Sequence, residues 1–175
     1  MRKLSLQELG RVDIDAFKSL DKIPIVIVLD NIRSAHNVGS FFRTADAFKI
    51  EHLYLCGITA QPPHREITKT AIGATESVAW SYTKDIVDIV NDLKSRDYHI
   101  IGIEQTDSSI PLSEISTNES CMYALIFGNE VQGLSDALLP LLDQAVEIPQ
   151  YGTKHSLNVS VCGGIVMWEL TKRFL

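Results

Sequence analysis

Cysteine is scarce in this sequence and forms no recognisable framework. The three cysteines, Cys56, Cys121 and Cys162, lie far apart, each within an apolar stretch, and none is part of a CxxC pair. A disulfide framework or a metal site would need cysteines that are paired or clustered. We therefore expect no bound metal and three buried free thiols, as in a cytoplasmic protein.

Long apolar runs are also missing. No stretch approaches the roughly 20 residues that a membrane helix requires, and Met1-Arg2-Lys3-Leu4 leads into polar and acidic residues rather than an apolar signal core. No repeat, low-complexity tract or flexible linker divides the 175 residues. These absences predict a single domain over residues 1–175, located in the cytoplasm and without a membrane partner.

Several common enzyme motifs are absent as well. No GxGxxG opens the first strand-to-helix turn, so neither a dinucleotide fold nor the usual glycine loop of nucleoside methyltransferases is indicated. The sequence has no GxxxxGK[ST] phosphate loop, no GxSxG nucleophile elbow and no HExxH metal pair. The function has to be inferred from less common patterns.

Positive charge is scarce in the second part of the chain. Residues 1–100 hold 13 Lys/Arg and 13 Asp/Glu, whereas residues 101–175 hold 3 and 9, which accounts for the net charge of −6. No lysine or arginine lies between Arg96 and Lys154. Because a polyanion binds cationic surface, any nucleic acid should contact the first part, with Lys154 and His155 joining it.

The apolar pattern predicts alternating strands and helices. Residues 24–29 form a continuous β-branched run, which is typical of a strand covered on both faces. The alternation predicts an α/β fold with a doubly wound, mainly parallel sheet and helices on both faces. The other expected strands are 52–56, 77–82, 98–104, 122–127 and 145–148; the expected helices are 4–20, with residues 1–22 as a helical extension, 38–48, 65–72, 85–95, 135–141 and 156–174.

Ligands bind such sheets beyond the carboxyl ends of the strands, and the segment after the first strand is rich in polar groups there. We expect Asn37 to cap the following helix and Gly39 to allow another backbone to come close. Arg43 lies one turn further on, between Phe42 and Thr44. Its guanidinium is either an inward-facing anion ligand or a surface group whose stem covers apolar residues.

Two further segments follow later strands. Gly128-Asn129-Glu130 ends one strand, and Gly133 precedes a helix that Ser135 could cap; this is either a close-approach loop around a carboxylate or a plain turn. In the third segment, Ser156 and Asn158 open the last helix. Gly163-Gly164 lies inside that helix, where each glycine costs about 1 kcal/mol relative to alanine. Another helix, a partner subunit or a threaded loop should therefore approach it closely.

Together these segments resemble the three motifs of the SpoU (TrmH-type) RNA methyltransferases of the SPOUT superfamily. The match consists of N-x-G-x-x-x-R at Asn37 to Arg43, G-N-E-x-x-G at Gly128 to Gly133, and I-P-x-x-G…S-L-N-V-S-V at Ile148 to Val161. Their order and spacing agree, and the resemblance covers roughly residues 24–172. Each motif alone is weakly specific, but three in order, each at a strand exit, are specific.

The resemblance implies a deep C-terminal trefoil knot, with the knot and cofactor region at about residues 121–172, and a homodimer that packs its last helix across the two-fold axis. It also implies S-adenosylmethionine as cofactor and methylation of a ribose 2′-hydroxyl in structured RNA, with tRNA slightly favoured over rRNA. An apolar slot would receive the adenine. The cofactor positions carried over are Gly128, Ile148 and Leu157, with Asn129, Gly133 and Gly152 in the same loops.

The resemblance also suggests roles for five polar residues. Arg43 would bind a phosphate beside the target ribose and position the hydroxyl, whose proton would pass to that phosphate or to a transiently neutral Arg43. Asn37 and Asn158 would orient the ribose or neighbouring loops. Ser156 would hydrogen-bond near Arg43, and Glu130 would hold Asn37 or Arg43.

RNA binding is expected from Arg33, His36, Arg65, Lys69, Lys154 and His155, although Arg65 and Lys69 could equally be ion-paired surface residues. Three other functions remain open from sequence. The chain could be a catalytically silent RNA-binding module of the same fold, a knotted methyltransferase acting on a base, or a flavodoxin-like nucleotide binder.

Overall fold

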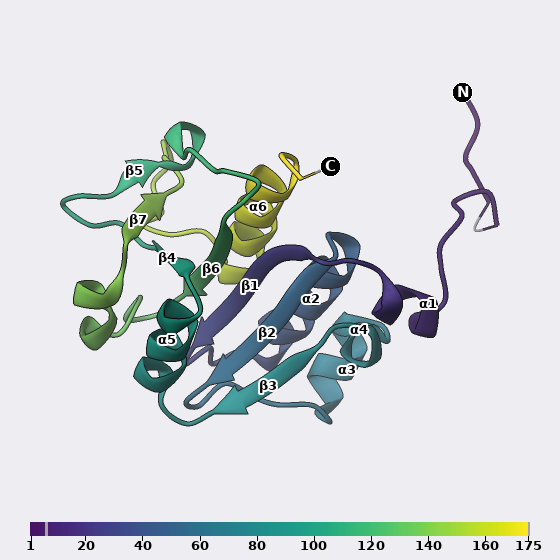
Figure 1. Ribbon diagram of the computed structural model, residues 1–175, viewed down its shortest axis with the longest axis horizontal. Helices are drawn as coiled ribbons and strands as arrows, with labels where there is room; N and C mark the ends of the chain where they lie inside the picture. The colour runs from purple at the N-terminus through teal and green to yellow at the C-terminus, as the bar shows by residue number, and fades with distance from the viewer. Residues whose placement is uncertain (6, 175) are drawn as a thin grey trace.

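A computed structural model describes residues 1–5 and 7–174, and its centre is a parallel β-sheet (Figure 1). Every strand pair in the seven-stranded sheet is parallel, and the strand order is β3-β2-β1-β6-β4-β7-β5. The predicted fold class is confirmed. The strands are β1 (Ile23–Asp30), β2 (Ile50–Cys56), β3 (Trp80–Thr83), β4 (Tyr98–Ile103), β5 (Ile110–Pro111), β6 (Met122–Phe127) and β7 (Gln144–Glu147).

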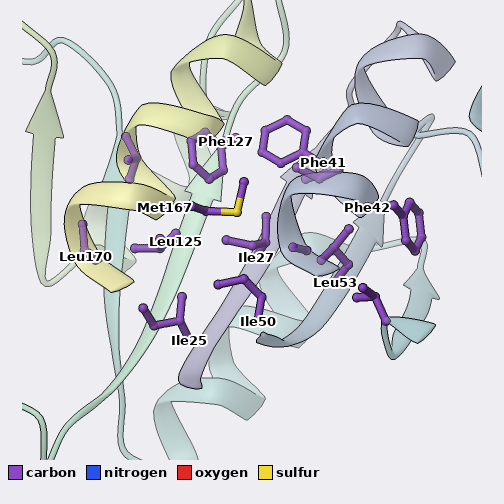
Figure 2. Packing of buried hydrophobic residues seen from close by; sticks show 14 of the residues in the cluster. Ile25, Ile27, Phe41, Phe42, Ile50, Leu53, Leu125, Phe127, Met167 and Leu170 are labelled. Carbon is purple, nitrogen blue, oxygen red and sulfur yellow. The ribbon is translucent and has the colours of Figure 1, made fainter. Parts of the chain in front are cut away.

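Helices cover both faces of the sheet, as the uninterrupted apolar runs of β1 and β6 require. One core lies between the sheet and helices α2 (Ala35–Ala47) and α6 (Val159–Thr171), where Figure 2 shows Phe41, Met167 and Leu170 over Ile27 and Leu125. The second core lies on the opposite face, under α5 (Ile86–Ser95) and the 3₁₀ helix η2 (Asp136–Leu141). The remaining helices are α1 (Ile14–Ser19), α3 (Arg65–Ala71), α4 (Ala74–Ser77) and η1 (Leu112–Glu114).

Two glycines mark places where α2 lies very close to a neighbouring helix. A Cβ on Gly39 would collide with Thr70 and with the Ile67 carbonyl of α3, so the expected close backbone approach is confirmed. A Cβ on Gly163 of α6 would collide with the ring of Phe41. The approach predicted for α6 therefore comes from a helix of the same chain at Gly163, whereas the space beside Gly164 is open.

The helix predicted near the N-terminus is much shorter in the structure. The helix expected over 4–20, and the helical extension over 1–22, reduce to α1, because Asp13 accepts the Ala16 N–H and so caps a helix that begins at Ile14. Gly10 has φ +59°, and the side chains of Leu4 and Leu9 are exposed. A short helix with no packed face is marginal in water. Leu6, also within that prediction, lies outside the described residues.

Four other element boundaries differ for local reasons. The expected strand 77–82 begins only at Trp80, because α4 extends to Ser77. The helix expected over 135–141 is a 3₁₀ helix, η2, which contains Pro140. The last helix begins at Val159, because Asn158 caps it, and the cap of α2 is Ser34 rather than Asn37. The short edge strand β5 was not predicted.

Candidate functional site

A cavity of about 820 Å³ lies at the carboxyl ends of β4, β6 and β7. The segments that follow these three strands and the start of α6 form its walls, so residues far apart in sequence meet there. We call it the acidic cavity. Its lining residues lie within 103–106, 127–134, 136, 139, 146–148, 150, 155–159 and 162.

The loop after β6 is closed by its own backbone. Asn129 and Gly133 exchange both N–H···O bonds at 2.9 Å, and the Asn129 side chain accepts from the N–H of Val131 and donates to the carbonyl of Asn31 at 2.8 Å. A Cβ on Gly128 would collide with the backbone of Gly133 and Leu134. Only glycine fits at Gly128, so this loop is a close-approach loop and not a plain turn.

Glu130 joins that loop to the beginning of α2. Its carboxylate accepts from the backbone N–H of Arg33 at 2.9 Å, the N–H of Ser34 at 3.2 Å and the side-chain amide of Asn37 at 3.0 Å. Burial alone would raise the pKa of Glu130, but these donors, which favour the charged form, lower it overall. The predicted contact between Glu130 and Asn37 is present; a contact between Glu130 and Arg43 is not.

Asn37 also contacts the first turn of α6. Its side-chain oxygen accepts from the Asn158 amide at 3.1 Å and from the Ser160 hydroxyl at 3.4 Å. Asn158 in turn accepts from Ser160 Oγ at 2.7 Å. The chain Glu130–Asn37–Asn158 thus connects all three motif segments through side-chain hydrogen bonds. Sequence reasoning missed Ser160, although it lies within the third motif.

Carboxylates dominate the charge of the acidic cavity. Glu104, Glu130, Asp136 and Glu147 line it, and no lysine or arginine is among its lining residues in the described part of the chain. Glu104 accepts from the N–H groups of Gln105 and Leu134 at 2.9 and 3.0 Å, and it fills the space beside Gly133, where a Cβ would collide with it. Cationic groups are favoured in such a cavity.

The loop after β4, which contributes Glu104 and Gln105, was not identified from the sequence. It obeys the same strand-exit rule as the three segments that were. It lacks the glycines that drew attention to them, so a search of every strand exit would have found it.

The residues proposed to bind the cofactor lie together at the acidic cavity, with one exception. Gly128, Asn129, Gly133, Ile148 and Leu157 all line the acidic cavity, as does Ser156. Gly152 does not line it, and the structure leaves Gly152 exposed with open space around its Cα. Gly152 is therefore separated from the positions with which it was grouped.

Arg43 lies elsewhere. It follows Asn37 by six residues on α2, which at about 100° and 1.5 Å per residue turns its side chain about 120° away and moves it about 9 Å along the axis. The side chain is exposed and lines a second hollow, of about 670 Å³, between α2, α4 and residues 9–20. The guanidinium is thus a surface group in one chain, and no contact joins it to Ser156 or to the acidic cavity.

The six residues expected to bind RNA are all exposed. Arg33 and His36 flank the start of α2, where the backbone carbonyl of His36 accepts from the Thr70 hydroxyl of α3 at 3.1 Å. His155 lines the acidic cavity, and its carbonyl accepts from Gln105 at 3.4 Å. Arg65 and Lys69 lie on α3 and form no ion pair within the described residues. Lys154 lies next to His155 in the loop after β7.

The three cysteines differ in how deeply they are buried. Cys56 is buried, Cys162 is half-buried at the wall of the acidic cavity, and Cys121 is exposed, so the expectation of three buried thiols was wrong for Cys121. Burial, with nearby Glu104, raises the pKa of Cys162 to about 11, which keeps this thiol protonated. Over residues 1–5 and 7–174, no group of three His, Cys, Asp or Glu side chains is placed to hold a metal, and no helix is suited to cross a membrane.

Comparison with known proteins identifies the family of the chain. A family model described as the SpoU rRNA Methylase family matches residues 24–168. A 23S rRNA (guanosine-2′-O-)-methyltransferase of Neisseria meningitidis is 30% identical over 159 residues, which are 91% of this chain and 62% of that protein. A tRNA (guanosine(18)-2′-O)-methyltransferase of Aquifex aeolicus is 30% identical, and the alignment covers 85% of this chain and 69% of that protein. This chain thus spans less than two thirds of the Neisseria relative.

The fold is shared with solved structures. A TrmH/SpoU tRNA modifying enzyme of A. aeolicus superimposes with a TM-score of 0.81 at 24% identity, covering 91% of this chain and 80% of its own. An AdoMet-bound rRNA methyltransferase of Sinorhizobium meliloti gives a TM-score of 0.82 at 24% identity, and the superposition covers 91% of this chain and 60% of that protein. At this identity the likeness concerns the fold.

Proposed function

Because the chain belongs to the SpoU rRNA methylase family, we propose that it transfers a methyl group from S-adenosylmethionine to a ribose 2′-hydroxyl in RNA. One observation carries this proposal: the Glu130–Asn37–Asn158 hydrogen-bond chain connects the three motif segments at the edge of one acidic cavity. The two relatives that are 30% identical bear the names of RNA 2′-O-methyltransferases, one for tRNA and one for rRNA.

The acidic cavity has the chemistry that S-adenosylmethionine needs. Its volume lies within the usual range for small-molecule sites, about 300–1,000 Å³. Ile148 and Leu157 supply apolar walls for an adenine ring, and the carboxylates suit a ligand that carries a sulfonium and an ammonium group. The cofactor supplies an electrophilic methyl group, and the protein has to hold the acceptor oxygen in line with it and exclude water.

We also propose that the protein works as a homodimer through the outer face of α6. Val161, Ile165 and Trp168, at helical spacing, are 53%, 41% and 53% exposed, and the space beside Gly164 is open. An apolar stripe with a glycine lets a second helix come close. The dimer would bring Arg43 of the partner subunit to the acidic cavity, which the geometry of α2 prevents within one chain.

In this proposed site each residue acts in a stated way. Arg43 of one protomer forks onto a phosphate beside the target ribose, because its guanidinium stays protonated near neutral pH and matches phosphate geometry. Asn37 and Asn158, oriented by Glu130, position the ribose. Ser156, at the cavity wall, contacts the same nucleotide. The hydroxyl would lose its proton to the bound phosphate or to a transiently neutral Arg43 as its oxygen accepts the methyl group and S-adenosylhomocysteine is released.

The family fold also leads us to propose a single domain whose C-terminal part, about residues 121–172, is knotted. The strand order supports this, because β6 lies between β1 and β4 while β7 lies on the far side of β4.

A labelled-methyl assay tests the activity. The purified chain is incubated with methyl-labelled S-adenosylmethionine and unmodified bulk tRNA or rRNA, and the product is digested with nuclease. Ribose methylation yields nuclease-resistant dinucleotides that carry the label. Label in single nucleosides would instead indicate a base methyltransferase, and RNA binding without any label would indicate a silent module.

A subunit-mixing experiment tests the shared site. Arg43→Lys and Asn158→Ala proteins are each inactive in the proposal, but a mixed dimer contains one site with an intact Asn158 cavity and the intact Arg43 of the partner subunit. Activity should therefore return on mixing. If Arg43 acts within its own chain, both sites of the mixed dimer stay defective and no activity returns.

A further inference from the structure

The second hollow, between α2, α4 and residues 9–20, combines positive charge with apolar surface. We call it the cationic hollow. Three cations, Arg11, Arg43 and Lys49, line it, together with the carboxylates Asp13 and Asp46. Its apolar wall includes Leu9, Val12 and Ile72, which are 44%, 52% and 66% exposed.

The two carboxylates are engaged in local structure. Asp13 accepts the Ala16 N–H at the start of α1 at 2.8 Å, and Asp46 accepts from the hydroxyl of Ser77. The side chains of Arg11, Arg43 and Lys49, in contrast, make no hydrogen bond or ion pair within residues 1–5 and 7–174. Three cations and two carboxylates leave the hollow with an excess of one positive charge, which favours the entry of an anion.

Lys49 faces a further cation. Burial lowers the pKa of the Lys22 ammonium, Asp46 opposes that effect, and the nearby charge of Lys49 adds to it. Lys22 itself lies over the Phe17 ring and donates to the Phe17 carbonyl, so it is not available to a ligand. Asp46 thus offsets part of the positive charge around Lys22 and Lys49, and the ammonium of Lys49 forms no ion pair within the described residues.

Two residues of the hollow have backbone conformations that favour glycine. Lys49 has φ +52° and Ile72 has φ +49°. Ile72 is the left-handed C-cap of α3, where its N–H donates to the Thr68 carbonyl, and this conformation is costly for a β-branched residue. Neither residue is needed for core packing, since Ile72 is largely exposed and Lys49 half-buried.

We propose that the cationic hollow binds a nucleotide of the RNA that flanks the methylated one, with its phosphate on Arg11 and Lys49 and its base against Ile72, Leu9 and Val12. The inference rests on the proposed RNA substrate. Residues 9–20, which supply Arg11 and part of the apolar wall, precede residues 24–168, which the family model matches. Arg43 lines the same hollow and would bind the adjacent phosphate.

The test compares two double variants that remove equal charge. Arg11→Ala/Lys49→Ala removes the two cations of the hollow, and the control Lys18→Ala/Lys84→Ala removes two exposed cations that do not line it. Binding of full-length protein to fluorescein-labelled unmodified bulk tRNA is measured between 50 and 200 mM KCl. Each phosphate contact contributes about 0.7–0.9 to the slope of log K against log salt. The hollow variant should lose about 1.5 in slope and roughly tenfold in affinity, and the control much less.

A third variant separates binding from folding. Ile72→Gly relieves the left-handed backbone, so its melting temperature should equal or exceed that of the wild type, while its affinity for tRNA falls about threefold or more because an apolar wall is lost. Equal salt slopes for the hollow variant and the control would overturn the proposal. So would dissociation of the dimer in sedimentation velocity by the hollow variant alone, since the hollow would then be a protein interface.

Failure of the inference and failure of the proposed function give different results. If the wild type methylates ribose but the hollow variant keeps the wild-type slope and KM for tRNA, only the inference fails. If the wild type transfers no methyl group yet its slope depends on Arg11 and Lys49, the RNA contact of the hollow stands and the proposed activity fails. If both hold, the hollow variant should raise KM for tRNA several-fold with little change in kcat.

Discussion

The acidic cavity and the cationic hollow are of similar size but opposite charge. The first is built from loops at the strand exits, with four carboxylates and backbone groups, and the second from helices and residues 9–20, with three unpaired cations. A cationic cofactor and a polyanionic substrate require such opposite surroundings. In the proposed function, separate parts of the chain would hold the cofactor and the RNA, and they would meet when a partner subunit brings its Arg43 to the cavity.

The substitution Arg43→Lys should have the largest effect of those that test this difference between the two regions. We expect kcat to fall at least about 100-fold, because an ammonium cannot reproduce the bidentate grip on a phosphate. The affinity for S-adenosylmethionine, measured by calorimetry, should stay within about twofold, since Arg43 does not line the acidic cavity of its own chain and is proposed to bind an RNA phosphate rather than the cofactor. Retained turnover would show that Arg43 has no part in the mechanism. A large loss of cofactor affinity would show that Arg43 also contributes to cofactor binding.

Gly128→Ala tests the cavity side alone. The added Cβ meets the backbone of Gly133 and Leu134, which cannot yield as a side chain would, so cofactor affinity should fall more than tenfold and the fold should lose about 1–3 kcal/mol. Gly152→Ala is the matched control, because nothing lies near its Cβ. Calorimetry and thermal melting measure both; a normal affinity in the Gly128 variant would remove this loop from the cofactor site.

The adjacent glycines Gly163 and Gly164 test whether a dimer forms through α6. Gly163→Ala should destabilise each chain by about 1–3 kcal/mol, because its Cβ meets the ring of Phe41. Gly164→Ala has open space and should stabilise an isolated helix by up to about 1 kcal/mol. If a partner helix packs there, the same change should instead weaken the dimer in sedimentation equilibrium.

The smallest expected effect concerns Glu130, the link between the motif segments. Its pKa is lowered in the folded protein, so its contribution to stability is present above the unfolded value, near pH 4.5, and is lost as the pH falls through the folded value. Because the residue is exposed, we discount its hydrogen bonds to about 1 kcal/mol, or about 2–4 °C in Tm. Glu130→Gln should show this deficit in thermal melts at pH 7 and progressively less of it below pH 4.5.

Much of the fold could be predicted because its signals are local. The apolar runs of β1 and β6, the helical spacing of α2 and α5 and the polar residues at strand exits are all visible in the sequence. The helix expected over 4–20 failed because periodicity alone does not stabilise a helix that has no surface to pack against.

The sequence by itself determined the α/β class, the three motif segments and the unequal charge of the two parts, because residue type and spacing carry these directly. Only the tertiary structure decided that Asn37 hydrogen-bonds to both Glu130 and Asn158, that Glu104 belongs to the same cavity, and that Arg43 faces another hollow. Those facts depend on which loops lie beside one another and on the turn of one helix, and contacts between residues about 90–120 positions apart leave no mark on local sequence.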